Sequence, residues 1–249
     1  MRKKILIFTL LFTVMACVAC SDKEAKDNSR EANTSTASED ENTENITQET
    51  SDNGIADLLN AEETSATLFD YELRDDGIYI HKYFGDDLYV VIPEQIEGKD
   101  VVGIDEKGFY GRRVKGVVIP GTIKEIGETA FGACDSLETI IIKDGNLKNI
   151  EKACFMLCKK LSYVQLPQGL EIIGPEAFDG CESLKRIELP DGVTTIGSAA
   201  FYHCLSLEEI ELPDSVTSIG GTAFMECPSL KELNVPDSVT TPKSDFYNN

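Results

Sequence analysis

Apolar and polar positions recur with a period of 23 residues along the second half of the chain. The stretches 161–183, 184–206 and 207–229 align almost position for position. Each has an aliphatic segment ending in Leu-Pro, a second aliphatic segment ending before Gly, and a closing Ala-Phe-x-x-Cys. A fixed period of roughly 20 to 50 residues is typical of solenoids, in which each repeat forms one coil. The pattern therefore predicts a stack of coils, and we interpret the remaining segments as its cap, tether and anchor.

Five coils follow this pattern along their whole length, and a sixth is partial. The coil 137–160 is one residue longer than the others and lacks the proline that they share. The sixth coil begins at Leu230 and departs from the pattern at Pro242, where an isoleucine is expected, so the polar tail after it is predicted to close the stack. The five full coils are 114–136, 137–160, 161–183, 184–206 and 207–229.

Each coil is predicted to contain two short strands and one helical turn. The segment Leu-x-x-Ile-x-Leu alternates apolar and variable positions, as a strand does, and the proline after it cannot donate to a ladder. The second segment is rich in β-branched residues and ends at a turn glycine, whereas Ala-Phe-x-x-Cys has helical spacing. Stacking would place equivalent strands roughly 4.8 Å apart in parallel sheets and equivalent apolar side chains in internal ladders. The predicted ladders are Phe131, Phe155, Phe178, Phe201 and Phe224, and Ile126, Ile150, Ile173, Ile196 and Ile219.

One cysteine recurs in every coil, which could indicate a disulfide chain, a metal ladder or a buried column. Equivalent Cβ atoms would stay near the strand spacing, beyond the ~3.8 Å that a disulfide prefers, and one column cannot surround zinc. We therefore predict free buried thiols, and the same for Cys154, which replaces an alanine. The column comprises Cys134, Cys158, Cys181, Cys204 and Cys227.

Residues 66–113 are predicted to form an N-terminal cap. Phe69–Leu73 and Gly77–Ile80 alternate as two strands, and Asp75-Asp76-Gly77 between them suits a hairpin turn. The segments 88–93 and 101–104 then echo the two strands of a coil. We interpret the whole as a β-hairpin followed by a degenerate first repeat, because the end of a solenoid needs an atypical unit to cover its core and sheet edge.

The N-terminus resembles a bacterial lipoprotein signal peptide. A basic start precedes an apolar run that is too short to span a bilayer comfortably, and small residues precede Cys17 and Cys20. Either cysteine is a candidate for lipidation, and a plain secretory signal cleaved near Ala19 is the alternative. We assign residues 1–19 to the signal peptide. Residues 20–65 are acidic and poor in apolar side chains, so we expect a disordered tether.

Charge and composition exclude several function classes. The net charge of −21 argues against binding nucleic acid or anionic lipid, because a phosphate backbone needs Lys and Arg. His81 and His203 are far apart in sequence, and no hydrolase, zinc-protease or phosphate-loop motif occurs. Glu208 and Glu209 are adjacent on a strand and face opposite sides, so they cannot act as an acid/base pair. The sequence thus predicts neither an enzyme nor a metal or cofactor site.

The full pattern L-x-x-I-x-L-P-x-x-V-x-x-I-G-x-x-A-F-x-x-C resembles the leucine-rich repeats of the BspA-like, Treponema-type class. The resemblance covers about 114–240 strongly and 68–113 loosely. It implies a right-handed, mostly β solenoid with a parallel concave sheet, which we predict over 114–249. It also implies a bacterial surface protein similar to adhesins that bind host or bacterial surface proteins.

The outward positions of the first strands form two columns on the predicted concave sheet, and these columns become acidic toward the C-terminus. Val118 and Ile141 would form an apolar patch with Tyr163, a type of patch that often marks contacts. Alternatively, the cap covers the two aliphatics, and the glutamates are a solvated face. The candidate protein-binding residues are Tyr163, Arg186, Glu188, Glu209 and Glu211.

These observations predict a non-enzymatic protein-binding or adhesion module, exported and anchored by lipid at the bacterial cell surface. Its expected partner is a host or bacterial surface protein that contacts the concave sheet. The alternative is a structural envelope component that associates with its own copies or with neighbouring surface proteins.

Overall fold

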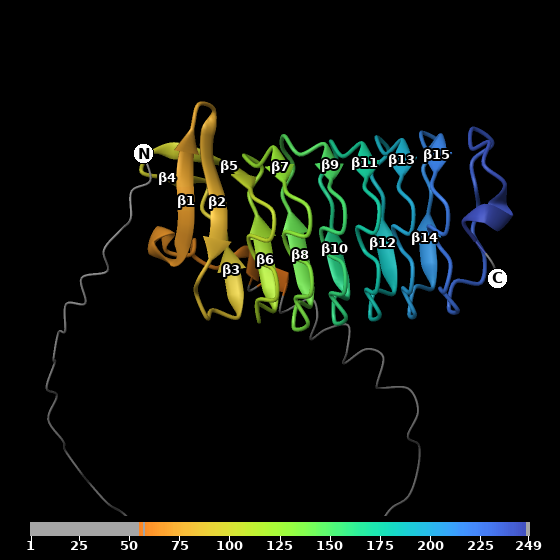
Figure 1. Ribbon diagram of the computed structural model, residues 1–249, viewed down its shortest axis with the longest axis horizontal. Coiled ribbons are helices and arrows are strands. Elements are labelled where there is room, and N and C mark those ends of the chain that lie inside the picture. The colour runs from red at the N-terminus through yellow and green to blue at the C-terminus, as the bar shows by residue number, and fades with distance from the viewer. Residues whose placement is uncertain (1–54, 57, 248–249) are drawn as a thin grey trace, which may run out of the picture. The chain divides into compact units, whose positions relative to one another are not determined.

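The computed structural model describes residues 55–56 and 58–247, and within them the predicted coils stack in a single row (Figure 1). This confirms the prediction of a mostly β solenoid built from parallel sheets. The predicted signal peptide, Cys17, Cys20 and the tether up to residue 54 lie outside the described residues. Among the described residues, no helix is both long and apolar enough to cross a membrane.

The first strand of each coil contributes to the main sheet. We use this name for the four-stranded sheet β10–β8–β6–β3 together with the β12–β14 pair, which continues the row in Figure 1. Its ladders are parallel and in register, so that Ile140 pairs with Val117 on one side and with Val164 on the other. The strands are β3 (Tyr89–Val91), β6 (Gly116–Ile119), β8 (Thr139–Ile142), β10 (Tyr163–Gln165), β12 (Arg186–Glu188) and β14 (Glu209–Glu211).

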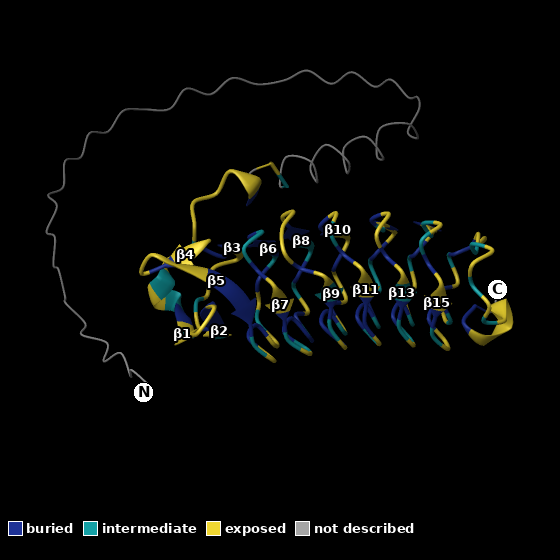
Figure 2. Ribbon diagram, turned by 90° about the horizontal axis from the view of Figure 1, so that it is seen from above, coloured by how far each residue is buried: buried dark blue, intermediate teal, exposed yellow. Residues whose placement is uncertain are grey.

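The second segment of each coil forms a strand of only two residues. Four of these strands make a parallel sheet in which Ile150, Ile173, Ile196 and Ile219 pair in sequence, as the predicted isoleucine ladder requires. Figure 2 shows these short strands one after another along the stack, and the isoleucine of each is buried. The strands are β7 (Glu125–Ile126), β9 (Asn149–Ile150), β11 (Ile172–Ile173), β13 (Thr195–Ile196) and β15 (Ser218–Ile219).

The third side of each coil differs from the predicted helical turn. At residues 128–133 the chain forms turns instead, and there Thr129 and Ala133 take left-handed backbone conformations with φ of 54°. Alternate amides therefore point along the stack: Phe131 donates to the carbonyl of Cys154 in the next coil at 2.9 Å. Gly132 donates within its own coil, to Thr129 at 2.9 Å. The spacing of Ala-Phe-x-x-Cys wrongly predicted a helical turn, because alternate backbone amides donate hydrogen bonds to the next coil and not within their own coil, as they would in a helix.

The predicted phenylalanine ladder is confirmed, and the cap extends it. Phe178 is fully buried, and its ring lies 5.3 Å from those of Phe155 and Phe201. Tyr83 of the cap stacks on Phe109 and so adds an aromatic ring to the N-terminal end. Along the whole column, successive centroids are 4.8 to 5.4 Å apart and the planes differ by 5° to 21°. The column comprises Tyr83, Phe109, Phe131, Phe155, Phe178, Phe201 and Phe224.

The cysteine column lies beside these rings, and the six described cysteines are free and buried, as predicted. Each column thiol donates to the phenylalanine carbonyl of the preceding coil, as Cys181 does to Phe155 at 3.4 Å and Cys204 to Phe178 at 3.3 Å. Cysteine thus combines a small apolar volume with a weak donor for a buried carbonyl, and this pairing accounts for its recurrence in every coil.

Three thiols of the column, Cys181, Cys204 and Cys227, are expected to resist alkylation in the folded chain. Burial raises the pKa of Cys181 and Cys204, and it raises the pKa of Cys227 to about 11. Because the thiolate is the nucleophile, iodoacetamide at pH 8 should label these cysteines at least about 100-fold more slowly in the folded chain than in urea. Peptide-resolved mass spectrometry measures both rates, and equal labelling with and without urea would contradict the buried column.

The N-terminal end is closed by the predicted hairpin and degenerate repeat. Antiparallel β1 and β2 meet at Asp75-Asp76, and β2 pairs in parallel with β5, which itself pairs with β7 of the first regular coil. A second hairpin, β4–β5, is inserted at this level. The elements are a 3-10 helix (Ala66–Leu68), β1 (Phe69–Arg74), β2 (Gly77–Tyr83), β4 (Gln95–Ile96) and β5 (Lys99–Ile104).

The C-terminal end is closed by the tail, as predicted. A short 3-10 helix at Lys243–Asp245 places Phe246 and Tyr247 against the last coil, where both are buried. The Phe224 amide donates to the Phe246 carbonyl at 2.8 Å, so the tail continues the ladder of the third side. The tail therefore covers the apolar end of the stack.

Candidate functional site

The candidate site is the outward face of the main sheet, on which the predicted residues lie in register. Residues alternate in and out along each strand, so the inward Val164, Ile187 and Ile210 are buried while their neighbours are exposed. In the ladder, Arg186 faces Glu209, and Glu188 faces Glu211. The structure thus brings four of the five predicted residues together on β12 and β14, with the fifth, Tyr163, on neighbouring β10.

Arg186 sits between two of the glutamates. Its guanidinium lies 3.5 Å from Glu188 and 3.4 Å from Glu209, and the three side chains are 56%, 84% and 71% exposed. Pairs this exposed contribute roughly 0–1 kcal/mol, so the contacts do little for stability. Glu211 has no ion pair within the described part of the chain. The cluster therefore carries a net negative charge that is free to meet a cationic partner surface.

Tyr163 adds the only large exposed apolar side chain of these five residues. Its side chain stands on the same face, and the residue is 37% exposed. Within the described residues its ring makes no hydrogen bond or ring contact with the other four. The structure thus places Tyr163 next to the charged cluster without coupling it to that cluster.

The N-terminal half of this face is apolar, and the chain itself covers it. Val118 and Ile141 are 2% and 0% exposed, and with Val91 they pack against Leu58 and Ile55 in a cluster separate from the main core. The exposed patch expected from Val118, Ile141 and Tyr163 is therefore absent. The alternative, coverage by the cap, is correct in outcome, but the covering residues belong to the predicted tether.

The segment 55–65 is a correction to the predicted domain boundary. Residues on both sides of position 57 are helical, and Figure 2 shows the segment on the outer side of β3, β6 and β8. It is tied to the edge of β3, where the Thr64 amide donates to Val91 at 2.8 Å and the Val91 amide donates to the Thr64 hydroxyl at 3.0 Å. Packed structure thus begins at least eleven residues before the cap boundary expected at residue 66.

A weak sequence signal for this segment exists. Ile55 and Leu58 are three positions apart, a spacing that puts both on one side of a helical turn, within a polar tract. Gly116 is a second signal, because it interrupts a column that elsewhere carries Thr139 and Tyr163. A Cβ at Gly116 would lie 2.8 Å from Leu58 Cδ2 and 2.9 Å from Tyr89 Cδ1, so this glycine makes the space that Leu58 fills.

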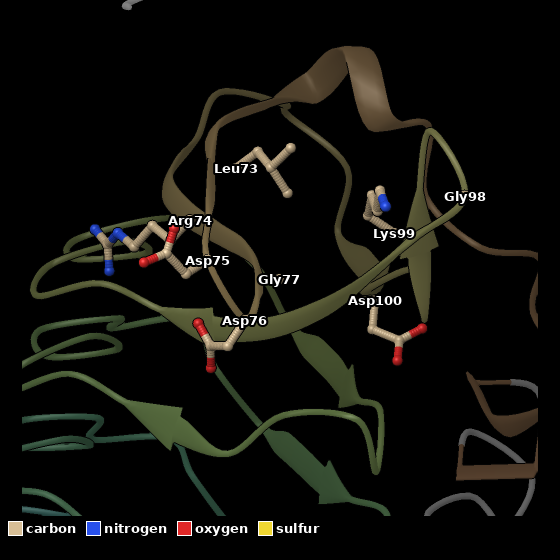
Figure 3. A pocket seen from close by; sticks show the side chains of 8 residues that line it. All are labelled: Leu73, Arg74, Asp75, Asp76, Gly77, Gly98, Lys99 and Asp100. Atoms are coloured by element: carbon tan, nitrogen blue, oxygen red, sulfur yellow. The ribbon is translucent and has the colours of Figure 1, made fainter.

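Two other places contain clustered polar groups. One is a depression of about 350 Å³ between the turns of β1–β2 and β4–β5. Figure 3 shows the side chains spread around this depression, with Arg74 and Lys99 on opposite sides, and the acidic and basic groups do not converge on one point. A catalytic pocket needs convergent polar groups. The lining residues are Leu73, Arg74, Asp75, Asp76, Gly77, Gly98, Lys99 and Asp100.

The other cluster surrounds His81 on the cap. Its ring contacts Asp105 and lies 3.5 Å from Glu72, and Arg74 donates to the same Asp105 carboxylate at 2.8 Å. Arg74 also stacks over the Tyr79 ring at 4.0 Å. This is a network of opposite charges without a nucleophile beside the histidine, and His203 lies in a distant coil next to Asp179. Among the described residues, no group of histidine, cysteine and carboxylate side chains could hold a metal ion.

Comparison with known families identifies the repeat. The BspA type leucine rich repeat region matches residues 102–198 and 148–249, with six copies of the repeat. The chain belongs to this BspA-type family. The match covers all five regular coils and part of the cap, so the resemblance inferred from the repeat pattern is confirmed.

Solved structures of similar proteins share the BspA-type coil stack. A T. pallidum leucine-rich-repeat protein is 35% identical, with a TM-score of 0.51 over 70% of this chain and 72% of that one. A Bacteroides ovatus leucine-rich-repeat protein is 36% identical, with a TM-score of 0.63 over 72% of this chain and 48% of that one. A leucine-rich cell surface protein from Faecalibacterium prausnitzii is 30% identical, with a TM-score of 0.60 over 69% and 54%. The chain thus spans about half the length of the last two, and no curated protein matches it.

Proposed function

We propose that this chain is a non-enzymatic protein-binding module of the bacterial surface, which holds a partner on the outward face of the main sheet. The observation that carries the proposal is the row of Tyr163, Arg186, Glu188, Glu209 and Glu211. Their exposed side chains stand in register on a rigid, stacked sheet. A surface of this kind suits a partner that presents basic groups, because complementary charge steers encounter and favours one orientation.

Surface location and anchoring complete this proposal. The similarity to a leucine-rich cell surface protein supports an exported module. The lipobox-like sequence supports a lipid anchor at Cys17 or Cys20, followed by an acidic tether. When Cys20 carries the lipid, residues 1–19 form the signal peptide, and the tether then holds the coil stack away from the membrane.

The test is a pull-down followed by matched charge reversals. The full chain is offered host extracellular matrix and bacterial surface extracts at low and physiological salt, and the affinity for any retained protein is then measured. The double variant Glu188→Lys/Glu211→Lys should weaken that binding at least about tenfold, because it replaces attraction to a basic partner with repulsion. A higher salt concentration should also weaken the binding of the wild-type chain, because salt screens the attraction between exposed charges.

The control changes the net charge equally at another site. Glu128→Lys/Glu226→Lys alters exposed glutamates on the third side of the coils and should leave the affinity unchanged. Equal loss in both variants, or no loss in either, would count against the proposed face. If the chain binds only other copies of itself in the pull-down, the alternative of a self-associating envelope component replaces the proposed function.

A further inference from the structure

The covered half of the main sheet differs in construction from the exposed half. One of its outward columns is aliphatic, with Val91, Val118 and Ile141, and the later coils carry Gln165, Glu188 and Glu211 in that column. The neighbouring outward column has a glycine, Gly116, between Tyr89 and Thr139. The absence of a side chain at Gly116 leaves space, and the three aliphatics line that space, so together they form an apolar site that we call the seat. Leu58 fills that seat and is 3% exposed.

The segment that carries Leu58 is attached by few contacts. Leu58 and Ile55 pack only in the small cluster on the outer face, whereas the solenoid core forms a separate cluster on the other side of the sheet. Its neighbour Leu59 points away and is 47% exposed. The hydrogen bonds that tie the segment to the sheet are made by Glu63 and Thr64, and they lie after Leu58 in the chain. Because residues 55–56 and 58–59 pack only in the small outer cluster and not in the core, this part can detach while the coil stack stays folded.

We propose that the seat is the apolar subsite of the partner-binding face, and that Leu58, with Ile55 beside it, occupies the seat as a displaceable internal ligand. The partner that fits carries a leucine-like side chain for the seat, with basic residues next to it for the glutamates of β12 and β14. Both halves lie on the same outward face, so one extended partner segment can reach both. The inference rests on the proposed function of that face and adds what the partner must contain.

A peptide supplied in trans tests the seat. The probes are a peptide with the sequence of residues 55–62 and a basic version with Asp57→Lys and Glu62→Lys. Binding to the full chain is measured for wild type and for the Leu58→Asp variant, whose own segment can no longer fill the seat. Burial of one leucine changes an equilibrium constant by roughly 10- to 100-fold. The variant should therefore bind the basic peptide at least about tenfold more tightly than wild type, because its seat is vacant.

Two further variants control for charge and for damage to the segment. Leu59→Asp introduces the same charge one residue away, at an exposed position, and should behave as wild type. Gly116→Thr leaves the sequence of the segment unaltered but places a Cβ against Leu58. The threonine side chain should therefore displace the segment and itself occupy the seat. Hydrogen exchange at residues 58–64 should then rise in Leu58→Asp and Gly116→Thr, while only Leu58→Asp gains peptide binding.

The outcomes separate this inference from the proposed function. If Leu58→Asp binds both peptides with equal affinity, the seat is supported and the acidic half of the proposed face is rejected. Equal binding to wild type and Leu58→Asp, or binding to neither, overturns the seat. In that case the proposed function still stands if the Glu188→Lys/Glu211→Lys variant loses the retained partner.

Discussion

Replacement of Phe178 by alanine is expected to lower the free energy of unfolding by about 3–5 kcal/mol, the usual cost of removing a fully buried phenylalanine. The ring is 0% exposed and stacks at 5.3 Å on both neighbours, so its loss leaves a cavity lined by the two rings. The surrounding coils cannot collapse into that cavity without breaking their ladders. Urea denaturation followed by far-UV circular dichroism measures the change.

The position of Phe178 near the middle of the column adds a second expectation. Each coil contacts only its neighbours, so the loss of one link weakens the coupling between the two halves of the stack. For Phe178→Ala we therefore expect the unfolding free energy to depend less steeply on urea concentration than in the wild type, or the two halves to unfold in separate transitions.

The control for Phe178→Ala is the same substitution at Phe84. That ring is 55% exposed and lies 5.9 Å from the cationic groups of Lys82 and Arg112. Phe84→Ala should change the stability by about 0.5 kcal/mol or less, as surface substitutions usually do. A cost below about 1 kcal/mol for Phe178→Ala would show that the column does not hold the coils together.

The coil register and its ladders could be predicted because each coil repeats the same residues at the same places. The phenylalanines and isoleucines of the core can be recognised because they recur at the same position in every coil. When coils of equal length stack in parallel, equivalent residues pair with each other, so the strand register is also determined. The hairpin at Asp75-Asp76-Gly77 could also be predicted, since alternation on both sides of a turn is a local signal. The repeat pattern and the local turn signal were therefore sufficient to predict the coil stack and the hairpin.

The turn conformation and the covering segment could not be predicted for two different reasons. The left-handed residues Thr129 and Ala133 are set by bonds to the next coil, and the sequence of one coil contains no sign of those bonds. Leu58 lies in a polar tract whose average composition indicates disorder, and its seat is formed by residues of three strands far along the chain. Exposure of Tyr163, Arg186 and the glutamates follows from alternation, whereas their role in binding stays a prediction.

Two adjacent glycines near the C-terminal end are expected to respond with opposite sign to alanine. A Cβ at Gly220 would lie 2.3 Å from the Ser198 amide nitrogen and 2.7 Å from the Gly197 carbonyl carbon, so it would collide with the backbone of the preceding coil. The Gly220 amide also donates to Ile196 at 2.8 Å, which holds the two coils at this distance. Gly220→Ala should therefore destabilise the chain by about 1–3 kcal/mol.

Gly221 supplies the matched control. A Cβ there would have only the Asp245 carbonyl oxygen nearby, at 3.9 Å, and its backbone is not left-handed. Gly221→Ala should therefore stabilise the chain by about 0.4–1 kcal/mol, because alanine reduces the entropy of the unfolded state. Thermal and urea unfolding of both variants measures the difference, and equal effects would contradict the close approach at Gly220. Glu151 holds the equivalent position in coil 137–160, so the stack can adjust to a side chain there. This adjustment is why we expect Gly220→Ala to weaken the stack and not to prevent folding.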